Sequence, residues 1–272
     1  MLSSIHRHFN LDWQKWDMKE IKEFWIDAFK DVFAYVKKNS PFYQERFMAI
    51  DENTISQLED IGGLPFTTKE DIQKNGDKFR AKPIHEIAQI HVSTGTTGGE
   101  AIAIYYTPGD LALNAQITQI EGTPQDLVFV CLPYEMSASG MAFHRSFQEK
   151  GCAVFPAGKG GAYSSVERTV ALIKKLRPSI LITTPTYAAY LFEQAQEIKV
   201  DLRENWNLTT LWLGGEGCSL ALKKRLERMW GCKAYCHYGS LEIGEIGVEC
   251  PTGPGYHISV PNIYLEIVDP DT

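Results

Sequence analysis

The chain has 272 residues, of which 44% are hydrophobic and 22% charged, and its formal net charge is −7. This composition is typical of a folded globular protein and argues against a disordered one. The chain has no long run of Lys or Arg and no apolar run near the roughly 20 residues that span a bilayer, so we expect neither a nucleic-acid nor a membrane partner.

The N-terminal residues lack the basic start and apolar core of a secretion signal. The six cysteines, in a chain of this length without such a signal, indicate reduced thiols rather than a disulfide framework. We therefore expect a cytoplasmic protein.

The first hundred residues predict helices and then two strands. Residues 19–38 place Ile21, Trp25, Ala28, Val32 and Tyr35 on one helical stripe, which should end before Pro41. A short helix should follow residue 66, with Thr67 or Thr68 as its N-cap. Branched and aromatic residues then predict strands over 87–93 and 101–107.

From about residue 126, short apolar strands alternate with longer helical segments. This alternation predicts an α/β fold whose sheet is mainly parallel and flanked by helices. Ser164 and Glu167 are expected to form a capping box at one helix start. The expected strands are 126–133, 152–158, 179–185, 209–215 and 233–239, and the expected helices are 137–151, 164–178, 186–198 and 219–230.

A glycine-rich loop, HVSTGTTGGE over 91–100, joins the two strands near residue 100. A Walker A loop would end in Gly-Lys-Ser/Thr and open a helix, and a dinucleotide-binding loop would also open a helix. Neither pattern is present. The loop is still suited to anions, because glycines expose main-chain N–H groups.

Three expected strand ends carry unusual residues, namely TTPTY over 183–187, LGGEG over 213–217 and HYGSLE over 237–242. Each segment alone is as well explained by a turn or a helix cap. In a parallel sheet, however, ligands bind at the carboxyl ends of the strands, and all three segments lie there. Together they predict one binding site.

The order of these segments resembles the adenylate-forming superfamily of acyl-CoA synthetases, and within it phenylacetate–CoA ligase and its relatives. The resemblance covers nearly the whole chain from residue 19. The segments that carry it are SPFY (40–43), LPFTTKEDI (64–72), HVSTGTTG (91–98), TTPTYAAYL (183–191), GGEG (214–217), ECPTGPGYHI (249–258) and YLEIVDPDT (264–272).

The resemblance implies ATP-dependent activation of a small carboxylic acid, of aryl or arylacetic type, to an acyl-adenylate that is then transferred to coenzyme A. ATP, Mg²⁺ and coenzyme A would be the cofactors, and a homodimer is left open. Two alternatives remain, a non-catalytic module that binds nucleotide or acyl groups, and an acyl-protein synthetase.

The resemblance also implies roles for individual residues. The loop would bind the β- and γ-phosphates, the GGE segment would line the adenine, Tyr238 would stack on the base, and Glu242 would hold Mg²⁺ and act in catalysis with Thr94 and Thr97. The nucleotide-binding residues would be Ser93, Thr94, Gly95, Thr96, Thr97, Gly98, Gly99, Gly214, Gly215, Glu216, Tyr238, Gly239 and Ser240. Tyr134, His144 and Tyr187 would line the acyl pocket, whereas Phe143 is as well explained as a core aromatic.

This sequence departs from the family pattern at several positions. Gly99 and Glu100 stand where relatives have Lys-Pro, Leu241 stands where they have a hydroxyl residue, and Glu245 could compete with Glu242 for the metal. Relatives continue beyond residue 272 with a small C-terminal domain, which we expect to be absent here. The expected organisation is a helical segment over 1–60 packed on an α/β nucleotide-binding core over 61–272.

Cys250 and His257 flank a turn rich in Gly and Pro, at a spacing that could supply two zinc ligands. The alternative is a buried thiol and a strand histidine. Cys236 and His237 are adjacent on an expected strand, so their side chains should point to opposite faces.

Overall fold

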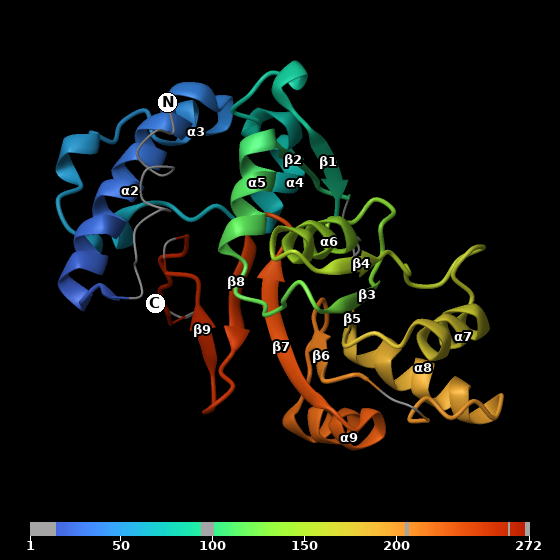
Figure 1. The fold of residues 1–272 in the computed structure, drawn as a ribbon. Coiled ribbons are helices and arrows are strands. Elements are labelled where there is room, and N and C mark those ends of the chain that lie inside the picture. The colour runs from blue at the N-terminus through green and yellow to red at the C-terminus, as the bar shows by residue number, and fades with distance from the viewer. Residues whose placement is uncertain (1–14, 94–100, 205–206, 261, 270–272) are drawn as a thin grey trace. The chain divides into compact units, whose positions relative to one another are not determined.

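The computed structural model describes residues 15–93, 101–204, 207–260 and 262–269 (Figure 1). Backbone contacts divide the chain into two compact units, one of residues 1–90, 94–108 and 260–272, and one of residues 91–93 and 109–259. Within the described ranges, no helix combines the length and apolar character needed to cross a membrane.

The first unit is built on the long helix α2 (Met18–Asn39), which begins at a capping box between Asp17 and Glu20. The helix ends at residue 39, as predicted from Pro41. The predicted apolar stripe is confirmed in part: Ile21, Trp25, Ala28 and Tyr35 are half-buried, but Val32 is 41% exposed, and the most buried side chains are Phe24 and Phe33. Large aromatic side chains determine which face of the helix is buried, as where Phe33 stacks on Phe47. The spacing of apolar residues alone does not take the size of their side chains into account.

Short elements complete the first unit. Thr68 caps α4 (Lys69–Asn75), one of the two predicted caps. Within the described residues, this unit also contains α3 (Pro41–Arg46) and the 3₁₀ turns Glu52–Thr54, Leu58–Gly63, Gly76–Phe79 and Ile84–Glu86. The predicted strands near the glycine-rich loop are confirmed as β1 (Gln89–Val92) and β2 (Ala103–Tyr106), which pair with one another.

The C-terminal residues of the described chain pack back on α2 within this unit. The indole Nε1 of Trp25 donates to the carbonyl of Val260 at 2.8 Å, and the Trp25 and Tyr264 rings lie 5.3 Å apart. This contact ties the two ends of the unit together.

The second unit is a seven-stranded sheet with the order β4-β3-β5-β6-β7-β8-β9. The first five strands in this order pair in parallel, which confirms the predicted α/β fold with a mainly parallel sheet. The strands are β3 (Leu127–Cys131), β4 (Ala153–Phe155), β5 (Ile180–Thr183), β6 (Thr210–Leu213), β7 (Lys233–Ser240), β8 (Gly244–Glu249) and β9 (Tyr256–Ile258).

The last two strands were not predicted. They pair antiparallel, β8 with β7 and β9 with β8. A short turn connects β7 to β8, so the chain reverses directly after the HYGS segment, and a bulge falls between Tyr238 and Gly239.

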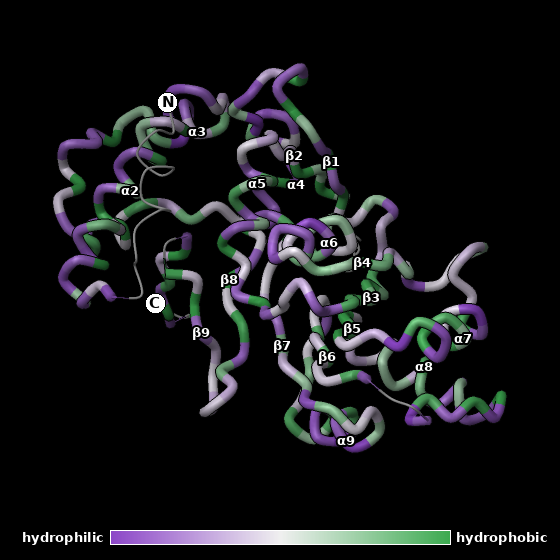
Figure 2. The backbone as a smooth tube through the Cα atoms, in the orientation of Figure 1, coloured by the Kyte–Doolittle hydropathy of each residue, from purple (hydrophilic) through white to green (hydrophobic). Residues whose placement is uncertain are grey.

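Helices cover both faces of the sheet, as expected when parallel strands are buried on both sides. One face packs against α7 (Val166–Leu176), α8 (Pro185–Glu197) and α9 (Leu220–Trp230), and the other against α6 (Ser139–Glu149). The remaining helix of this unit, α5 (Pro108–Ile117), precedes β3. In Figure 2 the tube through β3 and β5 is coloured mostly as hydrophobic, in line with the burial of every residue of these strands except Leu127, which is half-buried.

Most predicted helix ends are confirmed. Thr184 caps α8 and Pro185 is its first residue. The capping box at Ser164 was wrong, because α7 begins one residue later and Ser165 accepts the hydrogen bond from the Arg168 N–H. Ser164 instead donates to the carbonyl of Gly160.

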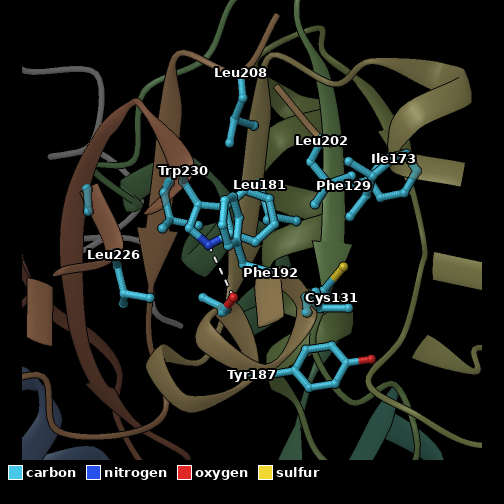
Figure 3. Close-up of a cluster of buried hydrophobic side chains, with 14 of the residues drawn as sticks. Phe129, Cys131, Ile173, Leu181, Tyr187, Phe192, Leu202, Leu208, Leu226 and Trp230 are labelled. Carbon is cyan, nitrogen blue, oxygen red and sulfur yellow. Dashed lines mark hydrogen bonds between the residues drawn. The ribbon is translucent and has the colours of Figure 1, made fainter. Parts of the chain in front are cut away.

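Trp230, at the end of α9, is fully buried in the larger core cluster (Figure 3). Its indole Nε1 donates to the carbonyl of Ala188 at 3.1 Å, which ties α9 to α8. Trp230→Phe should therefore lower the free energy of unfolding by about 2 kcal/mol, from lost packing and the lost hydrogen bond of the indole. Urea denaturation measures this, with Tyr163→Phe as a control at an 86% exposed site. A change within 0.5 kcal/mol would contradict the assigned role of the indole.

Candidate functional site

Polar residues gather where β4, β5 and β6 end. Because these strands are parallel, their carboxyl ends lie at one edge of the sheet, here called the carboxyl edge. Lys159 follows β4, Thr184 and Thr186 follow β5, and Glu216 follows β6. Residues from three separate segments of the sequence are thereby brought together.

Lys159 and Glu216 form the centre of this cluster. The Lys159 ammonium lies 3.3 Å from Oε1 of Glu216 and donates to Oγ1 of Thr184 at 2.9 Å. The other oxygen of Glu216 accepts from the hydroxyl of Thr186 at 2.6 Å and from its main-chain N–H at 3.3 Å. The carboxylate is thus held by the first turn of α8 and by one cation.

The charge of Glu216 is stabilised by these contacts. Partial burial raises the pKa of its carboxyl group, but the hydrogen bonds from Thr186 and Lys159 outweigh burial and hold the pKa below its ordinary value. The side chains of Lys159 and Glu216 are 26% and 32% exposed. They therefore remain within reach of a ligand at the carboxyl edge.

Gly214 and Gly215 follow β6 beside this ion pair. Gly215 is exposed and has φ = 79°, a conformation that strongly favours glycine. Gly214 is buried; it donates its N–H to the carbonyl of Thr183 at 3.1 Å, and a Cβ placed on it would lie 3.7 Å from His237. A flat ligand can therefore approach the main chain at Gly215, whereas Gly214 faces the side chain of His237.

The β7–β8 hairpin carries the other predicted nucleotide-binding residues. Tyr238 is 55% exposed, with its ring 6.1 Å from that of Tyr256 in an edge-on arrangement. Gly239 is required at its position, because a Cβ would collide with the carbonyl of Gly244. Ser240 is partly buried at the end of β7, and Glu242 is exposed in the turn that follows.

Glu245 is buried and hydrogen-bonded, whereas Glu242 is exposed. Its side chain is 2% exposed, and its carboxylate accepts from the main-chain N–H of Gln119 at 2.9 and 3.2 Å. Nε2 of His237 lies 3.4 Å from its Oε2. A carboxylate held in this way is not free to compete with Glu242 for a metal ion.

The residues expected to line the acyl pocket divide between the two faces of the sheet. The hydroxyl of Tyr134 lies 3.1 Å from Nδ1 of His144, and Tyr134 packs against the core cluster beneath α6. Burial lowers the pKa of His144 and raises that of Tyr134, and the imidazole tautomer sets which of the two donates in this hydrogen bond. Tyr187 lies in the other cluster, under α7 and α8 (Figure 3). Tyr134, His144 and Tyr187 therefore do not line a single wall of one pocket.

The glycine-rich loop is only partly described. Ser93 is partly buried at its start. The other loop residues named above lie outside the described residues, namely Thr94, Gly95, Thr96, Thr97, Gly98 and Gly99.

Cys250 and His257 do come together, on the β8–β9 hairpin. Hydrogen bonds from Thr252, and one from His257, lower the pKa of the Cys250 thiol to about 7. Among the described residues, no group of three or more His, Cys, Asp or Glu side chains could hold a metal ion. Zinc is therefore not supported.

Sequence reasoning missed Lys159 as a member of the site. It named Thr186 and His237 only within their segments, and Glu245 only as a competitor of Glu242 for the metal. Two signals were available in the sequence. Lys159 interrupts a run of glycines directly after a strand, and Glu245 is a single acid in the apolar stretch IGEIGV. Their partners are distant in sequence, so only the fold identifies the contacts.

The chain was compared with known proteins. The family model of AMP-binding enzymes matches residues 34–272. The phenylacetate–coenzyme A ligase of Thermus thermophilus is 31% identical over 257 residues, which are 90% of this chain and 56% of that protein. The Escherichia coli enzyme of the same name is 28% identical over 263 residues, 92% of this chain and 59% of that protein. The chain thus spans little more than half the length of these relatives.

Solved structures share the fold. A 2-hydroxyisobutyryl-CoA ligase in complex with 2-HIB-AMP and CoA, in its thioesterification state, has a TM-score of 0.86 at 23% identity and covers 94% of this chain and 57% of its own. An open conformation of that ligase has a TM-score of 0.84 at 22% identity, over 93% of this chain and 62% of its own.

The ion pair at the carboxyl edge is directly testable. Lys159→Met should raise the pKa of Glu216 towards its ordinary value, measured by ¹³C NMR of the carboxyl group. The pair should add less than about 1 kcal/mol, because both side chains are partly exposed. Because the folded-state pKa of Glu216 is depressed, this stabilisation should be fully present above the unfolded-state pKa of about 4.3 and should vanish as the pH falls through the folded-state pKa.

The matched control is Lys174→Met, which removes an exposed ion pair with Glu204. This control should leave the titration of Glu216 unchanged. An identical Glu216 titration in the Lys159→Met variant would contradict the assigned contact.

Proposed function

The chain belongs to the family of AMP-binding enzymes, and from that premise we propose that it binds ATP at the carboxyl edge and activates a carboxylic acid as an acyl-adenylate. The observation that carries the proposal is that two glycines after β6 adjoin the Lys159–Glu216 ion pair. Gly215 is exposed beside this ion pair, and Gly214 before it is buried without a side chain.

The adenine and ribose would lie over the glycines. Peptide planes without side chains allow close approach of a flat base, and the exposed ring of Tyr238 offers a stacking surface. Glu216 can accept hydrogen bonds from a nucleotide while Thr186 and Lys159 hold it in place. Its role is to orient, since its charge is already balanced.

The glycine-rich loop beginning at Ser93 would bind the β- and γ-phosphates through its N–H and hydroxyl groups. Glu242 would hold Mg²⁺ there. Its exposed carboxylate on a short turn fits a hard oxygen ligand, whereas buried Glu245 is occupied by Gln119. When bound, the ion offsets the repulsion between this carboxylate and the triphosphate.

In the reaction, a carboxylate oxygen of the acid attacks the α-phosphorus of ATP. The new bond gives an acyl-adenylate, and pyrophosphate leaves with the electron pair of the broken P–O bond. Such phosphoryl chemistry depends on positioning and on donors placed in advance. In a second step a thiol, which we propose to be that of coenzyme A, displaces AMP from the acyl group.

The named relatives support an aryl or arylacetic acid as substrate, since two of them are phenylacetate–coenzyme A ligases. A second candidate is a module that binds nucleotide without catalysis. The observation that favours this second candidate is Gly99-Glu100, which puts an anion rather than a lysine next to the phosphate loop.

Pyrophosphate exchange separates the two candidates. With Mg²⁺, ATP and a panel of aryl and alkyl acids, the chain should return labelled pyrophosphate to ATP when the right acid is present. Tight ATP binding with no exchange for any acid, also in a protein extended by a relative's C-terminal domain, would favour the non-catalytic module.

Binding of ATP should depend on the absence of a side chain at Gly214. Gly214→Val would fill the space over the main chain and should weaken ATP binding at least tenfold in calorimetry, without loss of the folded state. Gly62→Val is the matched control, because nothing lies within 4 Å of a Cβ at that position. Equal affinity in the Gly214→Val variant would place the nucleotide elsewhere.

A further inference from the structure

A buried histidine and carboxylate face one another on the β7–β8 hairpin. His237 lies on β7 and Glu245 on β8, with Nε2 and Oε2 3.4 Å apart and side chains that are 12% and 2% exposed. Removing a carboxylate from water is costly unless it is paired and hydrogen-bonded. Its presence in an otherwise apolar strand therefore requires an explanation.

Glu245 is fixed by the segment after α5. The main-chain N–H of Gln119 donates to both of its oxygens, and the Gln119 side-chain amide lies 3.3 Å from one of them. The imidazole of His237 lies beside the carboxylate, and the Lys150 ammonium interacts with it electrostatically. The negative charge beside Nε2 favours a proton on that nitrogen, and the neutral ring then has Nδ1 as an acceptor.

Nδ1 of His237 points to the glycine surface. A Cβ built on Gly214 would lie 3.8 Å from this nitrogen. In the described part of the chain, Nδ1 of His237 has no hydrogen-bond partner. Nδ1 of His237 is therefore a hydrogen-bond acceptor next to Gly214, a residue that the proposed nucleotide site also uses.

The far side of the histidine ring adjoins α6. Phe143 meets His237 edge-on, with ring centroids 4.7 Å apart at 79°. The next residue, His144, is hydrogen-bonded to Tyr134. Contacts thus link Glu245 to Phe143 through His237, and the neighbouring residue of α6, His144, contacts Tyr134. His144 and Tyr134 are two of the residues expected to line the acyl pocket.

We propose that the acyl pocket selects carboxylic acids that carry a hydroxyl or amino group on the acyl moiety, and that this group donates a hydrogen bond to Nδ1 of His237. The inference rests on the proposed function, since it assigns a substrate class to the same site. Glu245 is a positioning residue, which fixes the imidazole and its tautomer. A purely hydrocarbon acyl group would bury Nδ1 without a partner, and sites built around such a bond discriminate strongly against the analogue that lacks it.

Acyl-sulfamoyl adenosines, stable mimics of acyl-adenylates, test this by equilibrium binding without any need for turnover. Two isosteric pairs suffice, the 4-hydroxyphenylacetyl and 4-methylphenylacetyl compounds, and the 3-hydroxybutyryl and 3-methylbutyryl compounds. In at least one pair the hydroxyl compound should bind this chain at least tenfold more tightly than its methyl partner.

Two variants test whether His237 and Glu245 cause the preference for the hydroxyl compound. His237→Leu should bring that ratio close to one while the methyl compound still binds, and Glu245→Gln, which preserves shape, should reduce the ratio by releasing the tautomer. His85→Leu, at an exposed histidine, should keep the wild-type ratio. Thermal melting of each variant checks that it is folded.

The outcomes are distinguishable. Equal or weaker binding of the hydroxyl compound in both pairs would overturn the inference while leaving the proposed function intact. A wild-type ratio retained in folded His237→Leu would also overturn it. If no acyl-sulfamoyl adenosine bound at all, the proposed function would fail first, and the inference with it.

Discussion

Parallel pairing of β4, β3, β5, β6 and β7 is the constraint on which the candidate site depends. Each parallel strand must be followed by a crossover, and successive strands of β3–β7 begin at residues 127, 153, 180, 210 and 233. The central strands β3 and β5 carry apolar side chains in the core, with Thr183 at the end of β5 as the exception. The polar residues of the carboxyl edge follow these strand ends, and successive crossovers place those residues next to one another.

At this edge, glycine and charge have complementary roles. The glycines after β6 remove side chains, which opens the main chain to a ligand. Lys159 and the first turn of α8 hold the Glu216 carboxylate in a fixed position, from which it can orient a ligand. The β7–β8 hairpin adds an exposed tyrosine on one side and a buried histidine on the other. One edge thus offers a polar surface suited to a nucleotide and a partly buried wall suited to an acyl group.

Much of the fold could be predicted from the sequence because it follows local rules. The alternation of strands and helices predicted the parallel sheet, and Thr184-Pro185 predicted the start of α8. The antiparallel strands β8 and β9 escaped prediction, since glycines and the turn at Leu241–Ile243 obscure their pattern. The site was predictable where a motif names the residue, as for Gly214 and Glu216. Lys159 and Glu245 act through partners more than 50 residues away, and no local pattern reveals such a pair.

The central claim is that the adenine of ATP binds over the main chain of Gly214 and Gly215. A crystal structure of this chain with a bound acyl-adenosine sulfamate, or with ATP and Mg²⁺, tests it most directly. The account predicts the adenine over these two glycines, within hydrogen-bonding reach of Glu216 and beside the Tyr238 ring. Adenine density at any other surface, with this edge left to solvent, would contradict it.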